Sequence, residues 1–230
     1  MTGNMSLSRR QALLSGGVAA TTLVAGCSSG GDSATDEPEN TEEDTPQIVE
    51  STFDDGKEGW SVVDMETHAQ TSDPNWGEVI ETLEFTHEPS GGVDGTGHVS
   101  HVDTTSGVAF FFDASDTFLG DMSAFAGGQL TFALRSSHND IRQDSGVVFQ
   151  GQDTVVATQF DKPQSEWTSY TIALDADERT YYESNLNGEA VDQATLEAAL
   201  SDLQALRISG EHSGQAQETV GLDEVRLTSA

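Results

Sequence analysis

The chain has 230 residues with 40 acidic and nine basic side chains, which gives a formal net charge of −31. Nucleic acid is excluded as a partner because phosphate binding needs clustered Lys and Arg, and an electrostatic hold on anionic lipid is disfavoured for the same reason. The acids are scattered among aromatic and apolar residues, so the composition predicts a folded domain with an acidic surface. This composition resembles that of proteins from extreme halophiles. In molar salt the Debye length is about 3 Å, so repulsion between the acidic side chains of such a surface is screened.

Residues 1–27 are interpreted as an export signal of the twin-arginine lipoprotein type. The pair Arg9 and Arg10 precedes an apolar run that ends at Ala25 and is too short to span a membrane. The LVAGC sequence ending at Cys27 resembles a lipobox, in which the cysteine becomes the first residue and carries the lipid. A buried helix with a chance cysteine is the alternative, but arginine pair, apolar run and cysteine occur in the order of a signal. We therefore expect export by the twin-arginine route and a lipid anchor at the outer face of the cell membrane.

Residues 28–47 are predicted to be an acidic disordered tether, and residues 48–230 a single domain. Residues 28–50 contain eight acids and no basic residue, while Gly, Ser, Thr and Pro fill most other positions. A segment of this composition repels itself and cannot bury enough apolar surface to fold. We expect it to hold the domain away from the membrane surface.

The domain begins with a strand, a turn and a tryptophan. Residues 48–60 read IVESTFDDGKEGW, in which Gly56 suits a turn that needs positive φ and Trp60 opens a second strand. This order resembles the first strand of many jelly-roll carbohydrate-binding modules. Residues 79–86 alternate polar and apolar side chains, which predicts one half-buried strand. Residues 89–97 (PSGGVDGTG) predict a hairpin-like turn, because the lysine and helix of a phosphate loop are missing.

Residues 107–134 are the densest run of aromatic residues, glycines and strand formers in the chain. Three phenylalanines at 110–112 precede FLGD at residues 118–121, and FAGGQLTFAL follows at residues 125–134. This order resembles the laminin B domain, also called laminin domain IV.

Later segments continue the resemblance in the same order. They are residues 147–151 (VVFQG), 167–174 (WTSYTIAL), 195–208 (TLEAALSDLQALRI) and 221–227 (GLDEVRL). The sequence departs from the family where Ala126 stands in place of an expected aromatic residue. It also lacks the disulfide-rich repeats that flank the domain in animal laminins, which leaves a basement-membrane role without support.

The periodicity of the strands predicts the same architecture. Large apolar residues recur at period two in residues 130–134 and 170–174, as expected for strands with one face in a core. One helix is expected over residues 192–206, with Leu200 and Leu203 on its apolar stripe. We therefore expect an all-β fold, a jelly-roll β-sandwich of the galactose-binding or carbohydrate-binding-module type with one short helix. The side chains expected in the core include Phe118, Leu130, Phe132 and Leu134.

Catalysis is not expected. The sequence contains no GxSxG elbow, Walker loop or HExxH motif, and acids are so common that carboxylate pairs carry no information. His98 and His101 are three residues apart on a strand, so they face opposite ways and make a poor metal pair. Residues 210–214 (GEHSG) are expected to form a turn between closing strands rather than a Ser–His site.

The resemblance to jelly-roll modules implies a structural calcium ion where the first and last strands lie side by side. The acids at the corresponding positions are Asp54 and Asp223, with Asp55 or Glu224 as neighbours. Carboxylate and loop carbonyl oxygens suit Ca²⁺. The alternative is that these acids are solvated surface charges.

Ligand recognition would need exposed aromatic residues with polar groups nearby. Trp76, Tyr181 and Tyr182 lie in segments expected to be loops and are the candidates, with core burial as the alternative for each. The expected function is that of a lipid-anchored surface module that recognises a glycan or a surface protein without catalysis. The alternatives are an extracellular polysaccharide-degrading enzyme with an unrecognised site and a purely structural envelope lipoprotein.

Overall fold

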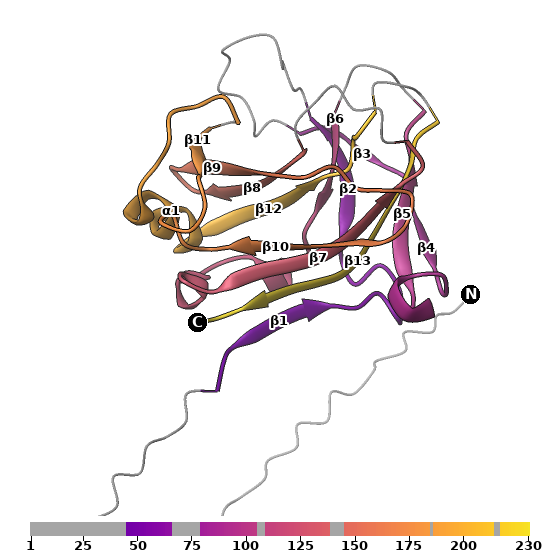
Figure 1. The fold of residues 1–230 in the computed structure, drawn as a ribbon, viewed down its shortest axis with the longest axis horizontal. Helices are drawn as coiled ribbons and strands as arrows, with labels where there is room; N and C mark the ends of the chain where they lie inside the picture. Colours follow the sequence, from indigo (N-terminus) through magenta and orange to yellow (C-terminus); the bar gives the residue numbers. More distant parts are fainter. Residues whose placement is uncertain (1–44, 66–78, 105–108, 139–144, 185, 214–216) are drawn as a thin grey trace, which may run out of the picture. The chain divides into compact units, whose positions relative to one another are not determined.

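The computed structural model describes residues 45–65, 79–104, 109–138, 145–184, 186–213 and 217–230 (Figure 1). Arg9, Arg10 and Cys27 lie outside these ranges, as do residues 28–44 of the predicted tether and Trp76, so the predictions made for them stay predictions. Within the described ranges, no helix is long and apolar enough to cross a membrane.

The described strands form two antiparallel sheets. Sheet A contains β1 (Ile48–Ser51), β4 (Thr86–Glu88), β5 (His98–Val102), β7 (Gln129–Ser136), β10 (Thr168–Ala173) and β13 (Thr219–Thr228). Sheet B contains β2 (Ser61–Met65), β3 (Val79–Leu83), β6 (Ala109–Asp113), β8 (Ser145–Gly151), β9 (Val155–Phe160), β11 (Tyr182–Glu183) and β12 (Leu203–Ser209).

The order of strands joins distant parts of the chain. Sheet A runs β10–β7–β13–β5–β4, and β1 pairs with the C-terminal half of β13, so the first and last strands lie side by side (Figure 1). Sheet B runs β11–β9–β8–β12–β6–β2–β3. The prediction of an all-β, jelly-roll β-sandwich is confirmed.

The core lies between the two sheets. Alternate side chains of each strand point into it, as period-two patterning requires. Phe118, Leu130, Phe132 and Leu134 are all buried there, as predicted. Aromatic rings contribute much of this core, for example Trp60, which packs edge-on against Phe118 with ring centroids 5.4 Å apart. The sandwich therefore has one continuous core built from both sheets.

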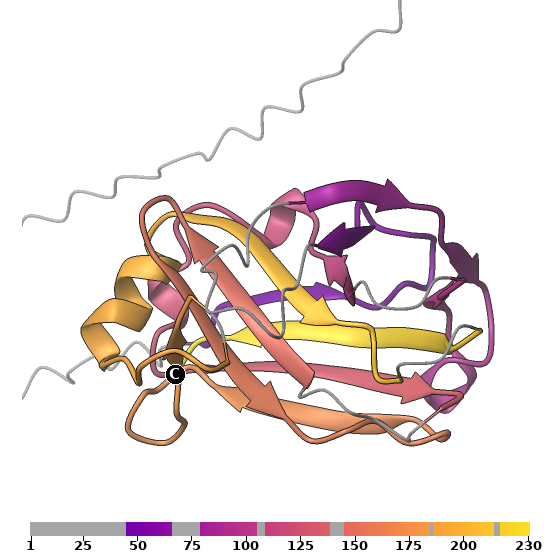
Figure 2. The ribbon, with the colours of Figure 1, turned by 90° about the horizontal axis from the view of Figure 1, so that it is seen from above.

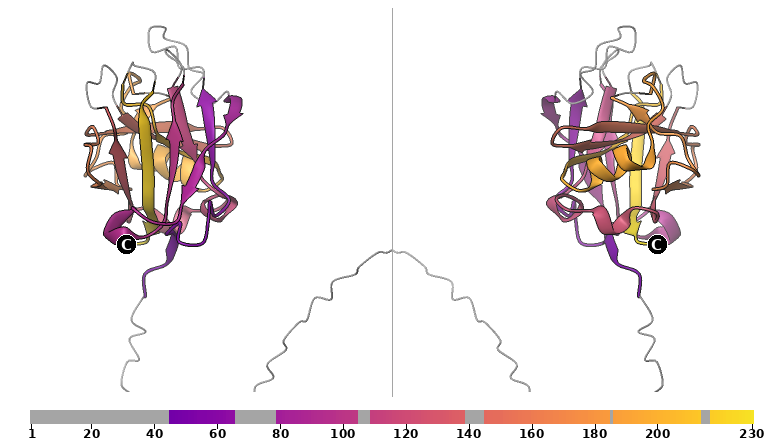
Figure 3. Two further views of the ribbon diagram at one scale, coloured as in Figure 1. Left: turned by 90° about the vertical axis from the view of Figure 1, so that its right-hand side faces the viewer. Right: turned by 90° about the vertical axis from the view of Figure 1, so that its left-hand side faces the viewer.

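The short helix α1 (Gln193–Leu200) lies at one end of the strands (Figures 2 and 3). Asp192 caps it by accepting a hydrogen bond from the backbone N–H of Thr195 at 3.0 Å. Leu196, Ala199 and Leu200 are its buried residues. Three single-turn 3₁₀ segments complete the described elements: η1 (Val93–Gly95), η2 (Asp116–Phe118) and η3 (Ser123–Phe125).

Two predictions of element boundaries are wrong. The segment 79–86 is two strands in different sheets, because the chain leaves sheet B after Leu83 and enters sheet A at Thr86. The helix predicted over residues 192–206 ends at Leu200, and Leu203 begins β12. In both cases strand pairing, which residues near in sequence do not specify, overrides the local pattern.

Candidate functional site

The outer face of sheet B, which points away from the core, is unusually apolar. The outer faces of antiparallel sheets are commonly polar because they meet water. Here a second cluster of buried side chains lies on that face, and Leu186 packs onto it from the segment that follows β11. The other members of this apolar strip are Val63, Met65, Ala109, Phe111, Val148 and Ala157. These side chains are at most 7% exposed, so the strip is already covered within the chain and is not itself available to a ligand.

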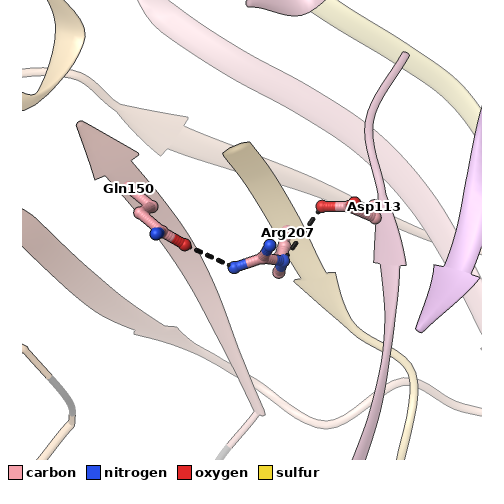
Figure 4. A network of polar contacts seen from close by, with 3 residues as sticks. All are labelled: Asp113, Gln150 and Arg207. Carbon is pink, nitrogen blue, oxygen red and sulfur yellow. Dashed lines mark hydrogen bonds and ion pairs between the residues drawn. The ribbon is translucent and has the colours of Figure 1, made fainter. Parts of the chain in front are cut away.

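A polar network lies beside the apolar strip on the same face (Figure 4). Arg207 on β12 forms an ion pair with Asp113 on β6, with Nε and Oδ1 2.9 Å apart, and its Nη1 donates to Gln150 Oε1 on β8 at 2.7 Å. Arg207 is only 6% exposed, whereas Asp113 and Gln150 are partly exposed. Burial raises the pKa of Asp113, and the neighbouring guanidinium opposes that rise. The buried cation thus fixes a carboxylate and an amide at the surface, where both can bind hydroxyl groups of a ligand.

Tyr182 stands in line with this network. Strand register places it opposite Ala157, which is opposite Val148, and Val148 is in turn opposite Arg207. Tyr182 is partly exposed and packs against the apolar strip. Together, Tyr182, Arg207, Asp113 and Gln150 form what we call the sheet B site.

A pocket of about 230 Å³ adjoins Tyr182. Arg179 stabilises the wall of this pocket. Its Nε donates to Thr158 Oγ1 at 2.9 Å, and its Nη2 donates to the carbonyl of Gln159. The residues lining the pocket are Thr158, Gln159, Arg179, Thr180 and Tyr182. One aromatic ring beside hydroxyl, amide and guanidinium groups is the chemistry that a sugar ring needs.

The prediction that Tyr181 serves as an exposed platform is wrong. Its side chain is 0% exposed and packs in the core against Phe149, and its hydroxyl donates to the carbonyl of Ala173 at 2.6 Å. Neighbouring residues in an extended segment point to opposite sides, so Tyr182 reaches the surface while Tyr181 does not.

Sequence reasoning missed a second aromatic cluster, on the outer face of sheet A. Trp167, which immediately precedes β10, is partly exposed, and the Arg135 guanidinium lies 4.7 Å from its ring centroid. His98 packs edge-on against the same indole at 5.3 Å. The signal available in the sequence was the WTSY segment, which was interpreted only as scaffold. We call Trp167, Arg135 and His98 the sheet A patch.

The structure brings Asp54 and Asp223 to the same loop between β4 and β5. Asp54 is exposed, and its Oδ1 lies 3.4 Å from the N–H of Gly97, whereas Asp223 is fully buried. The groups that donate to Asp223 are the N–H groups of Val93 and Glu224, each at 2.7 Å, and the hydroxyl of Thr96 at 3.3 Å.

These donors bear directly on the calcium prediction. Burial raises the pKa of Asp223 to about 6, and hydrogen bonds oppose that rise. A cation at this carboxylate would share its two oxygens with the two N–H groups and the hydroxyl that already donate to them. Across the residues that the structure describes, no group of three or more His, Cys, Asp or Glu side chains is placed to hold a metal ion. Calcium binding stays a prediction.

Two Ser–His pairs lie among the described residues: the adjacent residues Ser137 and His138, whose Oγ and Nδ1 are 2.9 Å apart, and a buried pair. Ser145 Oγ lies 2.7 Å from His212 Nδ1, and these residues are 1% and 0% exposed. Burial lowers the pKa of His212 to about 3, so the imidazole is neutral at ordinary pH. A nucleophile must reach its substrate, and this serine is buried. The buried pair supports the structure of the loop rather than a reaction.

Buried carboxyl groups lie next to this pair. Glu218 accepts hydrogen bonds from the backbone N–H groups of His212 and Ser213 at 3.1 and 2.9 Å. Glu211 is buried, and within the part of the chain that the structure describes its Oε2 lacks a hydrogen-bond partner. Burial raises the pKa of Glu211 to about 8, and the charges of Asp103, Glu218 and Asp64 raise it further. Burial and the neighbouring carboxylates therefore favour the protonated form of Glu211.

Comparison with solved structures identifies the fold. The L4b domain of human laminin alpha-2 superposes with a TM-score of 0.58 at 13% identity, covering 80% of this chain and 97% of that one. A family 11 carbohydrate-binding module of a Clostridium thermocellum cellulosomal cellulase has a TM-score of 0.45 at 16% identity, covering 80% and 96% of the two chains. The similarity to the laminin domain establishes the sandwich fold. The TM-score for the carbohydrate-binding module is too low to support a further argument.

Sequence comparison identifies the family. None of the curated proteins matches this chain. The model of the Laminin B (Domain IV) family matches residues 111–230, which begin within β6 and include the network around Arg207. The match covers more than half of the sequence, in the order of segments that the FLGD and FAGGQLTFAL motifs predicted. The chain belongs to the laminin B (domain IV) family.

Proposed function

We propose that this protein is a lipid-anchored module at the outer face of the cell membrane that binds a glycan, without catalysis, at the sheet B site. The observation that carries the proposal is the alignment of Tyr182 with the network of Arg207, Asp113 and Gln150. A sugar needs an apolar or aromatic surface for its ring and fixed polar groups for its hydroxyls. The sheet B site offers both on one face of rigid strands.

The polar groups of the site are held in place before a ligand arrives. Arg207 is buried and contacts both Asp113 and Gln150, so neither of these side chains has to be ordered by the ligand. Immobilising a side chain on binding costs about 0.5–1.5 kcal/mol, and a preorganised site avoids that cost. The geometry therefore favours binding of a hydroxyl-rich ligand.

Sequence features outside the described residues supply the location. Arg9 and Arg10 support export by the twin-arginine route, and Cys27 supports a lipid anchor at the membrane. The acidic residues that follow Cys27 would space the domain from the surface. Replacing Cys27 with Ala should release the protein from the membrane fraction into the medium, and retention in the membrane would contradict the anchor.

Glycan binding is tested on an array of polysaccharides and oligosaccharides. The unmodified protein should bind a subset, and Tyr182→Ala should abolish that binding while the melting temperature stays close to that of the unmodified protein. Ile80→Ala is the matched control, because Ile80 is 54% exposed on β3, at the opposite edge of sheet B. Equal binding by both variants would contradict the proposal.

The same reagents separate the alternatives. Release of reducing ends from a bound polysaccharide would show an enzyme with an unrecognised site, whereas binding without product fits a module. If no glycan binds, capture of a purified surface protein that depends on Tyr182 would favour protein adhesion. If the protein binds neither a glycan nor a surface protein, the remaining alternative is a purely structural envelope lipoprotein.

A further inference from the structure

The sheet A patch is held in one arrangement by a glycine and a carbonyl. Gly221 on β13 lies opposite Arg135 on β7, and a Cβ at Gly221 would lie 2.9 Å from Trp167 Cη2 and 3.2 Å from Arg135 Nε. The indole Nε1 donates to the carbonyl of Gly91 at 3.0 Å. Both side chains therefore lie across β13 over a position that has no side chain. The patch is preorganised.

Arg135 differs from two other arginines of the domain. Arg207 is paired with Asp113, and Arg226, on the same outer face as Arg135, lies 3.7 Å from a carboxylate oxygen of Glu50. Arg135 makes no ion pair with any described carboxylate, although the chain contains 40 acids. Its one hydrogen bond within the described residues is from Nη2 to His98 Nε2 at 2.9 Å. Its other N–H groups are therefore available to an acceptor from outside the chain.

His98 reinforces this arrangement. A guanidinium can only donate, so His98 Nε2 accepts and the neutral ring carries its proton on Nδ1. Burial lowers the pKa of His98, and the Arg135 charge lowers it further. His98 is only 2% exposed, and its Nδ1 has no hydrogen-bond partner among the described residues. The cation of the patch is thus Arg135 alone, held by a neutral imidazole.

We propose that the sheet A patch is a second binding site, separate from the sheet B site, for a saccharide that carries a carboxylate. The guanidinium of Arg135 donates to the carboxylate, and the exposed part of Trp167 packs against the sugar ring. Exposed hydroxyl side chains of β10, on Ser169 and Thr171, lie on the same outer face and extend the polar surface. The inference stands independently of glycan binding at Tyr182.

The net charge of −31 opposes an anionic ligand at long range. In molar salt the Debye length falls to about 3 Å, so this repulsion is screened while direct contact between guanidinium and carboxylate persists. Binding of the acidic saccharide should therefore strengthen from low to molar salt. A simple ion-pair site on a neutral protein would weaken instead.

The test compares an oligouronate with its carboxyl-reduced, neutral counterpart by calorimetric titration of the full chain in molar salt. The oligouronate should bind about 10- to 100-fold more tightly, which is the contribution of a charge-assisted hydrogen bond. Arg135→Gln should remove that preference, whereas Arg226→Gln, the matched arginine on the same face, should keep it. Tyr182→Ala should also keep it.

Several results would overturn the inference. These are equal affinity for the two saccharides, a preference that survives Arg135→Gln, and polyglutamate binding as tight as oligouronate binding. A preference lost in Tyr182→Ala but kept in Arg135→Gln would place the acidic sugar at the sheet B site, which contradicts this inference and leaves the proposed function intact. Arg135→Lys, which keeps the charge but loses the planar fork, provides a folded variant in which the preference should be reduced if Arg135→Gln unfolds.

Discussion

The two sheets share a core but differ on their outer faces. On sheet B the arginine is buried, paired with a carboxylate and placed beside an apolar strip. On sheet A, Arg135 is partly exposed, packs on an indole and has no ion pair with a carboxylate among the described residues. A paired, buried cation orients neighbouring polar groups, whereas an unpaired cation at the surface is itself available to an anion. The faces are therefore suited to different ligands.

The largest effect is expected when the buried pair is broken. Arg207→Gln leaves Asp113 partly buried without its counter-charge, which should cost about 3–5 kcal/mol of unfolding free energy. The corresponding change on sheet A, Arg226→Gln, removes an exposed pair and should cost at most about 1 kcal/mol. Urea unfolding of both variants measures the difference, and equal losses would contradict the contrast between the faces.

A second prediction concerns the pH range from 4.5 to 8. The pKa of Glu211 is about 8 in the folded chain against an ordinary 4.5, so the folded state binds more protons between these values. Stability should therefore fall as pH rises from 4.5 to 8. Glu211→Gln should flatten this slope in urea unfolding at a series of pH values. An unchanged slope would show that another group is responsible.

His212 should act on the acid side. Its pKa is about 3 when folded against an ordinary 6.5, so the unfolded chain binds the proton first and stability should fall as pH decreases from 6.5 towards 3. In His212→Asn this acid-side loss should be smaller, whatever the variant's stability at neutral pH. If the acid limb is identical in the variant, the neutral state of the buried imidazole is contradicted.

A smaller effect is expected from adding a methyl group on either sheet. In Gly221→Ala the new Cβ displaces the ends of Trp167 and Arg135, which should cost about 1 kcal/mol and change the indole fluorescence. In Gly146→Ala on sheet B, the new Cβ would lie 3.0 Å from Leu186 Cδ1 and displace that side chain. This change should leave the indole emission unchanged. Identical spectra for all three proteins would contradict the placement of the indole over β13.

The smallest effect tests calcium on sheet A. If Asp223 binds calcium, a chelator should lower the melting temperature of the unmodified protein by a few degrees and have no effect on Asp223→Ala. Identical melts of the unmodified protein with and without chelator would remove the calcium site.

The sequence predicts where the strands lie better than it predicts which strands pair with each other. Period-two patterns locate β7 and β10, and the aromatic and Gly-Gly motifs identify the family, because both are local features. The Arg207–Asp113 and Trp167–Gly221 contacts depend on which strands pair, and no local pattern specifies that. Tyr181 and Tyr182 show the same limit within two residues: composition favours either as a platform, and only the register of β11 on β9 decides which one is exposed.

The central claim is that a glycan binds the outer face of sheet B. It is tested most directly by NMR chemical-shift mapping of the protein with a saccharide selected on the array. The account predicts that shifts concentrate at Tyr182, Gln150, Asp113 and Arg207, and that they disappear in Tyr182→Ala. Shifts confined to sheet A or to the loops at the ends of the sandwich would contradict it.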